Sequence, residues 1–488
     1  MTVMNATHSE PPMTVLLGLP FHDTTLEETL DFCREAMKGG ESRYLVTANV
    51  DFTTQAYADA DLRKIVFFAD RVVCDGMPLV WLSKVFGQAL RERVAGSDMV
   101  PRLLEICGRE GLPVYFFGSD LETLIEAKKI AEERYPGLQV VGVDSPPFGA
   151  VIEWDNEALC ERMRASGAKL LLACLGCPKQ ERWIYAHHRE CGIPLSIGVG
   201  ASLDFITGKQ KRAPRWMQKT GLEWFWRMAG NPSRLAKRYG HDLVFLVRAA
   251  LVQAWSQRRR GALELAQLNP PPLRPAALQV TRLIWAGELR KSELEGAPLP
   301  ELVDKAVFLD ASRVAFIDSS GLGRLALLIR MCRVAGKDLF VVQPSAVFRG
   351  ALEDSRMSSL VTMLDSDVEA MERLRTAGQA VARREAKPGG EIWVAFDRAL
   401  DAVYHDEMIA SLESAVAEAG EGGVLVLDLS KVGFIDSRAV GGLIRIWKKM
   451  SAQGGGMFLA HPSAEVREII GLLRLDKVLP EWKGEHVS

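Results

Sequence analysis

The sequence predicts an α/β protein in which a parallel β-sheet covered by helices is followed by two copies of a smaller α/β domain. Three observations support this class. Short apolar runs alternate with helical patterns in the first half, two stretches rich in proline or glycine interrupt the chain, and the last two segments repeat each other. Alternation of strands and helices is typical of a parallel sheet with helices on its faces.

The composition limits the classes of function. A chain of 488 residues with a net charge of −2 has room for two to four domains and gives no general attraction to nucleic acid. Its eight cysteines do not resemble a disulfide framework and favour a reducing compartment. The first residues lack the cationic start and apolar core of a signal peptide. The best apolar segment, Leu243–Trp255, is too short for a membrane span and is broken by Arg248.

Two interruptions divide the chain. The first is the proline-rich stretch 268–277 and the second is the stretch 377–390, which ends in KPGG. They predict a first domain over 1–267, a second over 278–376 and a third over 391–488. Within the first domain we expect a core at 14–208 and a basic appendage at 209–262.

The first domain contains short apolar runs that suit strands buried on both faces. These runs are Tyr44–Ala48, Val114–Gly118, Val140–Val143, Leu170–Leu175 and Leu195–Val199. Helices are predicted between them, one starting with a capping box at Thr25 and Glu28, and another over Leu121–Arg134. Ligands of such sheets gather beyond the carboxyl ends of the strands, so the loops after the strands are the candidate site.

Small polar residues and glycines are concentrated in these loops, where they allow a ligand to approach the backbone closely. The clusters are 47–51 (TANVD), 74–78 (CDGMP), 93–98 (RVAGSD), 176–181 (GCPKQE) and 198–204 (GVGASLD), with 118–120 (GSD) after a further strand. In this order, and followed by 221–227 (GLEWFWR) and 232–239 (PSRLAKRY), they resemble the WecG/TagA/CpsF glycosyltransferase family over roughly 14–245.

The resemblance implies a Rossmann-like enzyme that uses a UDP-sugar. Such an enzyme transfers a sugar, here an N-acetylhexosamine or its uronic acid, to a polyprenyl-diphosphate-linked saccharide. Transfer proceeds with inversion, without a metal and without a cofactor. It serves surface-polysaccharide assembly at the inner, cytoplasmic face of the membrane, where the protein is peripheral. The family also forms homo-oligomers, but this sequence sets no number of subunits.

Asp75 is the residue that we expect to act as the general base for the acceptor hydroxyl, because the catalytic aspartate of the resembled family occupies this motif. The alternative is that Asp75 only caps the helix that begins near Met77. Gly76 follows it in the same turn. Cys74 stands where the family usually has alanine, a small change that leaves Asp75 in place.

Further polar residues are assigned to the site on the same resemblance. Arg93 and Gln180 match positions facing the active site of the family and are therefore expected to be catalytic, and an arginine suits bidentate contact with phosphate. Arg93 could alternatively form an ion pair with Glu92 or Asp98. Thr47 and Asn49 are expected to bind the donor or merely to cap a helix. Gly76, Gly118 and Gly176 are also predicted to bind substrate. Asp98 and Asp204 are less certain, because either could serve only to fix a loop.

The appendage combines cations with tryptophans, which suits a membrane interface with anionic headgroups. An ordinary packed amphipathic helix and a surface for single-stranded nucleic acid are the alternatives, and we expect no nucleic acid. In the resembled family this region also supplies arginines to the diphosphate. Arg227 and Arg234 match those positions best, while Lys237 and Arg238 compete for a third.

Two motifs imitate metal sites. Asp59-Ala-Asp61 looks like the metal-binding DxD of other glycosyltransferases, but we place it on the solvated face of a helix. Cys174 and Cys177 look like a redox or zinc pair, but no second pair accompanies them. We therefore predict no metal ligands.

The last two segments match without a gap. The sequence VFLDASRVAFIDSSGLG from Val307 is repeated 118 positions later as LVLDLSKVGFIDSRAVG from Leu425. Each copy predicts strand, turn, helix, strand, loop and helix. The motif around Asp318 resembles the STAS family of anti-sigma-factor antagonists, over roughly 278–375 and again over 391–483.

The STAS resemblance implies a serine at a helix start that a partner kinase phosphorylates, with a regulator that reads its state. The matching residues are Ser319, oriented by Asp318, and Ser437. Both could serve only as helix caps. Arg438 replaces the second serine of the motif, which argues against kinase recognition in the second copy and could imitate a regulated charge.

Two functions follow from these assignments. The leading hypothesis is a UDP-sugar-dependent glycosyltransferase that its STAS domains regulate or dock to a synthesis complex. The competing hypothesis is an inactive membrane-located scaffold that signals through the STAS domains. Hydrolysis of a nucleotide sugar is a weaker third option. The residue types at Asp75, Thr47, Asn49 and Gln180 favour the enzyme.

Overall fold

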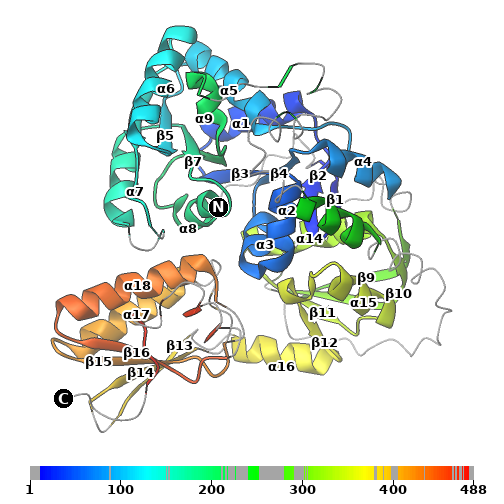
Figure 1. Ribbon diagram of the computed structural model, residues 1–488. Helices are drawn as coiled ribbons and strands as arrows, with labels where there is room; N and C mark the ends of the chain where they lie inside the picture. The colour runs from blue at the N-terminus through cyan, green and yellow to red at the C-terminus, as the bar shows by residue number, and fades with distance from the viewer. Residues whose placement is uncertain are drawn as a thin grey trace. The chain divides into compact units, whose positions relative to one another are not determined.

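A computed structural model describes most of the chain (Figure 1). The described residues are 11–86, 90–149, 151, 154–209, 213–214, 217, 226, 240–251, 280–290, 302, 304, 306–377, 382–387, 390–396, 400, 405–432, 435–463, 466–467, 470–471, 475 and 478–482. They form two compact units, 1–370 and 371–488. The predicted division of the first unit at 267/278 stays a prediction.

The centre of the first unit is a six-stranded sheet in which every pair of neighbouring strands is parallel. Its order is β4 (Arg71–Cys74), β3 (Arg43–Ala48), β8 (Leu195–Gly198), β7 (Leu170–Cys174), β5 (Val114–Gly118) and β6 (Val140–Asp144). The predicted parallel sheet is confirmed. The apolar-run analysis missed β4, whose four residues are all buried.

Helices cover this sheet on both faces (Figure 1). They are α1 (Leu26–Lys38), α2 (Val50–Ala58), α3 (Ala60–Phe67), α4 (Met77–Val85), α5 (Gly96–Glu110), α6 (Leu121–Arg134), α7 (Asn156–Ala165), α8 (Lys179–His187) and α9 (Ser202–Thr207). The predicted capping box starts α1: Glu28 N donates to Thr25 Oγ1 at 3.2 Å, and Thr25 N donates to Glu28 Oε2 at 3.0 Å. Helix α6 has the predicted bounds.

A β-hairpin precedes α1 and was not predicted. Strands β1 (Met13–Leu16) and β2 (Leu19–His22) pair antiparallel around Leu17 and Gly18, whose φ angles are 51° and 80°. Two positive φ angles are what a tight two-residue hairpin turn requires. All eight strand residues are buried, and Val72 N on β4 donates to His22 Nδ1 at 3.0 Å. The hairpin therefore extends the core beyond the edge strand β4.

The first repeat forms a four-stranded parallel sheet in the order β12-β11-β10-β9. Its elements are β9 (Val280–Leu289), β10 (Ala306–Ile317), α14 (Ser319–Val334), β11 (Asp338–Val342), α15 (Ala346–Asp354), the short 3₁₀ helix η2 (Ser358–Leu360), β12 (Thr362–Leu364) and α16 (Asp367–Ala377). Residues of β1, β10, α14 and α15 share one hydrophobic core, so this repeat packs against the hairpin.

The second repeat has a four-stranded sheet in the order β13-β14-β15-β16, with only β13 antiparallel. Its elements are β13 (Ala382–Ala386), β14 (Ile392–Phe396), α17 (His405–Ala419), β15 (Val424–Asp428), α18 (Ser437–Ala452) and β16 (Gly456–Ala460). Adding 118 to the bounds of α14 and β11 gives those of α18 and β16. The two copies therefore share this helix and strand from end to end.

Candidate functional site

The loops after β3, β4 and β8 meet at the carboxyl edge of the six-stranded sheet, as the sequence predicts. Asp75 N donates to Ala48 O at 2.9 Å, which joins the loops of β3 and β4. A methyl group built on Gly96 would lie 3.7 Å from Thr47 Oγ1 and 3.8 Å from Ser202 Oγ, which places α5 against the ends of β3 and β8. Residues far apart in the sequence therefore surround one edge.

Asp75 lies in the loop between β4 and α4, with 25% of its side chain exposed. The N-cap of α4 is Gly76, and no side chain forms a capping hydrogen bond there. Asp75 is therefore not the N-cap residue of this helix. Its Oδ1 instead lies 3.8 Å from Arg93 Nη1, so the carboxylate faces a cation and remains partly accessible.

Arg93 connects two aspartates. Its Nη2 donates to Asp98 Oδ2 at 2.8 Å while its Nη1 faces Asp75, and only 15% of its side chain is exposed. The predicted ion pair with Asp98 is present. The alternative pairing with Glu92 is not the one found, because Glu92 Oε2 accepts from Leu26 N at 3.0 Å.

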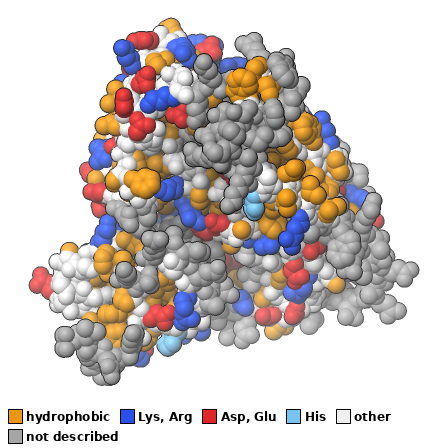
Figure 2. Space-filling view, in the orientation of Figure 1, with side chains coloured by type: hydrophobic (Ala, Val, Ile, Leu, Met, Phe, Trp, Pro, Cys, Tyr) orange, Lys and Arg blue, Asp and Glu red, His pale blue; other side chains and the backbone are white. Residues whose placement is uncertain are grey.

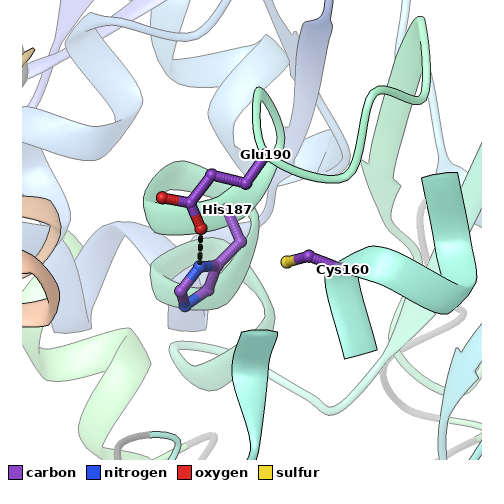
Figure 3. A group of neighbouring side chains, drawn as sticks. All are labelled: Cys160, His187 and Glu190. Atoms are coloured by element: carbon purple, nitrogen blue, oxygen red, sulfur yellow. Dashed lines mark hydrogen bonds and ion pairs between the residues drawn. The ribbon is translucent and has the colours of Figure 1, made fainter. Parts of the chain in front are cut away.

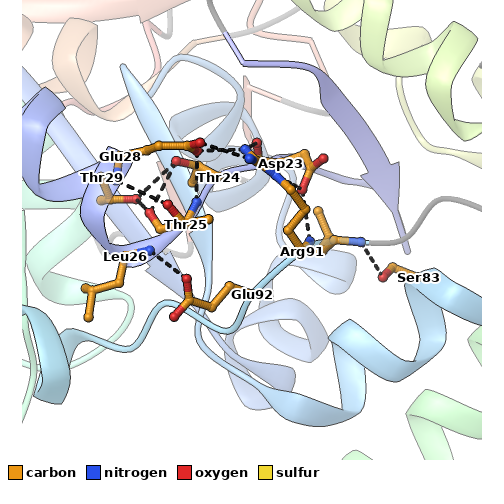
Figure 4. Close-up of polar contacts among 10 residues, drawn as sticks. Asp23, Thr24, Thr25, Leu26, Glu28, Thr29, Ser83, Arg91 and Glu92 are labelled. Carbon is orange, nitrogen blue, oxygen red and sulfur yellow. Dashed lines mark hydrogen bonds and ion pairs between the residues drawn. The ribbon is translucent and has the colours of Figure 1, made fainter.

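The segment before Arg93 is fixed to the start of α1, as Figure 4 shows. Arg91 pairs with Asp23 at 3.3 Å and with Glu28 at 2.6 Å, and Leu90 N donates to Ser83 Oγ at 3.0 Å. Hydrogen bonds to α4 and to the start of α1 therefore hold Leu90 and Arg91 in place. They thereby position Arg93 beside Asp75.

Thr47 and Asn49 differ in how they are engaged. Asn49 Oδ1 accepts from Phe52 N at 3.0 Å and caps α2, as the alternative for this residue predicted. Thr47 Oγ1 donates to Gly198 O at 3.5 Å and is half-buried between β3 and β8. Both lie at the predicted edge, and their binding of a donor stays a prediction.

Gln180 is buried at the start of α8 and joins the loops that follow β7 and β8. Its Oε1 accepts from Gly176 N and from Gly200 N, both at 3.1 Å, and its Nε2 donates to Glu181 Oε1 at 2.8 Å. A methyl group built on Gly198 would lie 2.6 Å from that Nε2. Since both ends of the amide are engaged by the protein, Gln180 is placed to position the loops of the site.

Glu181 is a residue whose environment the sequence did not reveal. It is 4% exposed, and its Oε2 has no hydrogen-bond partner among the described residues. Burial raises the pKa of Glu181 to about 7. An acid in the first turn of a helix is ordinary in a sequence, so nothing in the pattern distinguishes this buried carboxyl from a solvated one.

Two of the predicted glycines have structural reasons to be glycine. Gly118 has a φ of 91°, and a methyl group there would lie 2.8 Å from Leu175 Cδ2 and 2.9 Å from Cys174 C. Gly176 has a φ of 77° with nothing within 4 Å of such a methyl group. The first permits close packing of two strand ends, and the second permits the turn in which its N–H reaches Gln180.

The motifs set aside in the sequence have other roles. Asp59 ends α2 and caps α3, with Leu62 N donating to its Oδ1 at 3.0 Å, so the expected position within one helix is wrong. Arg182 pairs with Asp59 at 2.6 Å and with Asp61 at 3.4 Å. Cys174 is buried at the end of β7, and Cys177 Sγ contacts Gln55 Oε1 at 3.8 Å.

Asp204, one of the two less certain site aspartates, lies in α9. Burial raises the pKa of its carboxyl group.

The predicted arginines of the appendage, Arg227, Arg234 and Arg238, lie outside the described residues, as does Lys237. The described part of this region includes a helix over 240–251. None of the helices in the described ranges is long and apolar enough to cross a membrane.

The serine motifs of the repeats begin the corresponding helices. Asp318 caps α14 by accepting from Ser320 N at 2.8 Å and from Gly321 N at 3.0 Å. Ser319, the first residue of α14, is only 1% exposed. In the second repeat Asp436 caps α18, which begins at Ser437, and Arg438 lies 3.8 Å from Asp406.

Comparison with known proteins agrees with this architecture. The model of the glycosyl transferase WecG/TagA/CpsF family matches 14–260, about half of the chain, and the model of the STAS domain matches 248–370 and 386–487. An N-acetylglucosaminyldiphosphoundecaprenol N-acetyl-beta-D-mannosaminyltransferase of Bacillus spizizenii is 28% identical over 191 residues, which cover 39% of this chain and 72% of that protein.

Among solved structures, a Thermotoga maritima protein described as an anti-sigma factor antagonist is 20% identical with a TM-score of 0.20, covering 22% of this chain and 87% of that one. The match of the glycosyltransferase model spans the parallel sheet and its loops, and the matches of the STAS model span the two repeats. The chain is therefore a glycosyltransferase of the WecG/TagA/CpsF family that also carries two STAS domains.

Proposed function

We propose that this enzyme transfers an N-acetylhexosamine, or its uronic acid, from a UDP-sugar to a polyprenyl-diphosphate-linked saccharide, with inversion and without a catalytic metal. The observation that carries the proposal is the Asp75–Arg93 pair at the carboxyl edge of the sheet. The Bacillus relative, whose name specifies transfer of N-acetylmannosamine to an undecaprenol-linked acceptor, supports this class of substrate.

The chemistry needs a base for the acceptor hydroxyl and positive charge for the departing diphosphate. Asp75 is the base in this proposal, because its carboxylate is partly exposed and faces Arg93. Arg93 holds that carboxylate beside Asp98. Gln180 fixes the loops after β7 and β8 around the donor. Arg227, Arg234 and Arg238 supply the cations for the diphosphate.

A membrane contact fits the helix over 240–251. Its residues Leu243, Val244, Val247 and Leu251 are each more than half exposed, and their spacing places them on one face. Phe245 anchors the helix to the core by packing against Tyr57, with ring centroids 5.1 Å apart. Figure 2 shows hydrophobic side chains gathered over this helix and α4. This apolar face would insert at the headgroup level of the membrane that holds the acceptor.

Regulation by the first STAS domain fits its contact with the hairpin (Figure 1). Helix α14 approaches β1 so closely that a methyl group on Gly323 would lie 1.8 Å from Met13 O. Arg330 is buried beside His22 and lies 3.4 Å from Asp70 Oδ1. We propose that this domain controls the enzyme through the hairpin. Phosphorylation of Ser319 would disturb the contact, because the buried start of α14 has no space for a phosphate.

The two STAS copies differ at the residues that make this contact. The positions that correspond to Arg330 and Arg333 in the second copy are Lys448 and Ser451. Arg333 stacks on Phe68 with its guanidinium carbon 3.3 Å from the ring centroid, a contact that serine cannot form. The second copy, over 386–487, is therefore proposed to bind a separate regulator or kinase.

The decisive experiment measures UDP release from a panel of UDP-sugars in the presence of a short-chain polyprenyl-diphosphate-GlcNAc acceptor. We expect release that depends on the acceptor and that Asp75→Asn lowers by about 10²- to 10⁴-fold, the usual contribution of a general base. The control is Asp31→Asn, a carboxylate on α1 away from the candidate site. Equal rates for wild type and Asp75→Asn would refute the assigned base. No release from any donor would favour the scaffold hypothesis.

A further inference from the structure

A cluster of metal-ligating side chains lies at the edge of the sheet opposite to the candidate active site. Cys160 is on α7, which leads into β7, while His187 ends α8 and Glu190 follows it before β8. Their ligand atoms all lie within 4.8 Å of one another. Figure 3 shows the Cys160 sulfur and the Glu190 carboxylate directed toward the His187 ring.

A fourth ligand group adjoins these three. Cys191 Sγ lies 3.4 Å from Cys160 Sγ, and His187 Nδ1 lies 2.9 Å from Glu190 Oε2. Zinc bonds of about 2.0–2.3 Å in a tetrahedron separate neighbouring ligand atoms by roughly 3.3–3.8 Å. Both measured distances are within half an ångström of that range. Cys191 lies outside the group whose ligand atoms are all within 4.8 Å of one another, so its side chain would have to turn toward His187 and Glu190 to complete the tetrahedron.

The chemistry of the ligand atoms selects the metal. Thiolate sulfur and imidazole nitrogen are the ligands that Zn²⁺ prefers over Mg²⁺ or Ca²⁺, and a carboxylate completes many zinc sites. Cys160 and Cys191 are buried, whereas His187 and Glu190 are half-buried. The group is therefore open on one side for entry of the ion and enclosed on the other.

We propose that Cys160, His187, Glu190 and Cys191 bind a structural Zn²⁺ ion that joins α7 to the connection between α8 and β8. The ion would hold the end of α8 that is remote from Gln180 and Glu181. Its role would be to fix α8, which carries the loop-positioning Gln180 at its other end. The site contributes no group to sugar transfer, so it does not depend on the proposed reaction.

The first test is the metal content of the full-length protein, purified under reducing conditions without a metal-affinity column and dialysed against trace zinc. We expect about one zinc per chain by plasma mass spectrometry. The Cys160→Ala/Cys191→Ala variant should contain almost none. Cys107→Ala is the matched control, because Cys107 is also buried but lies outside the cluster, against Met37. A wild-type chain without zinc, or a double variant with a full complement of zinc, would overturn the proposal.

A second measurement needs no variant and remains informative if the double variant fails to fold. X-ray absorption at the zinc edge of the wild-type protein should show two sulfur and two lighter ligands. A zinc ion with only nitrogen and oxygen neighbours would contradict the assignment. A Cys160–Cys191 disulfide in the freshly reduced and dialysed protein would do so too. Trp183, whose ring centroid is 5.3 Å from that of His187, should also change its fluorescence when a strong chelator removes the metal.

Discussion

At the residue scale, the candidate site combines a partly exposed ion pair, Asp75–Arg93, with two buried polar side chains, Gln180 and Glu181. Asp75 and Arg93 could be selected because a resemblance marks their motifs, and the structure pairs them. The burial of Glu181 could not be predicted, since it depends on how the loops after β7 and β8 close around α8. Gln180 was assigned to catalysis, but its amide is occupied by two backbone N–H groups and a carboxylate. Which polar groups are engaged by the protein is a property of the packing.

Glu181 makes stability depend on pH. Burial raises its pKa to about 7 in the folded state, above the usual 4.5, so its contribution is fully present below about pH 4.5 and is lost as the pH rises through 7. The unfolding free energy of the wild type should fall, relative to Glu181→Gln, by an amount on the order of 3 kcal/mol over this interval. Denaturant titrations of both proteins from pH 5 to pH 8 measure the difference. Parallel curves would show that Glu181 does not titrate there.

At the element scale, strands and helices with strong local signals were predicted with nearly correct bounds. The capping box at Thr25 and the central runs of the sheet are examples, because local hydrogen bonds and apolar character determine them. Strand β4 was not predicted, because its four residues, RVVC, are too short a run to be distinguished from a loop. The hairpin was not predicted either. Its two strands are fully buried, partly by elements hundreds of residues away in the sequence, so they lack the alternation of apolar and polar residues that marks a half-buried strand.

The repeat provides a matched test of the hairpin contact. Gly323 and Gly441 occupy equivalent positions in α14 and α18, but only Gly323 faces another backbone, and nothing lies within 4 Å of a methyl group on Gly441. Gly441→Ala should raise stability by up to about 1 kcal/mol through helix propensity. Gly323→Ala should instead displace Met13, which is expected to increase hydrogen exchange over 13–22.

The two alanine variants should also differ in activity if the first STAS domain controls the enzyme through the hairpin. Gly323→Ala is expected to change the rate of UDP release, whereas Gly441→Ala should leave it unchanged. Unaltered exchange over 13–22 in Gly323→Ala would mean that α14 does not contact the hairpin in solution. Altered exchange with an unaltered rate would leave the contact standing as purely structural.

At the scale of the whole molecule, the order of modules was predicted from composition and repetition, whereas the attachment of the first STAS domain to the enzyme was not. A linker rich in proline predicts separation, but residues 1–370 form one compact unit, in which Met13, Val15 and Phe67 share a hydrophobic core with the first repeat. The contact with the hairpin and its neighbours also involves Arg330 and Arg333, which the second copy replaces with Lys448 and Ser451. The match between the two STAS copies predicts their common fold. It cannot predict that only the first copy contacts the hairpin, because residues that differ between the copies take part in that contact.

The apolar face of the helix over 240–251 predicts how the whole molecule meets a membrane. Leu243→Glu/Val247→Glu would place two charges on that face, where a carboxylate is costly at the acyl boundary. Flotation with anionic liposomes should decrease at least about tenfold, because two aliphatic side chains would no longer insert into the membrane, a loss of more than about 1.4 kcal/mol. Val368→Glu is the control, since Val368 is an exposed aliphatic residue of the first STAS domain, outside this helix. If the control loses flotation as strongly as the double variant, net charge rather than this face governs binding. If neither does, the membrane contact lies elsewhere in the appendage.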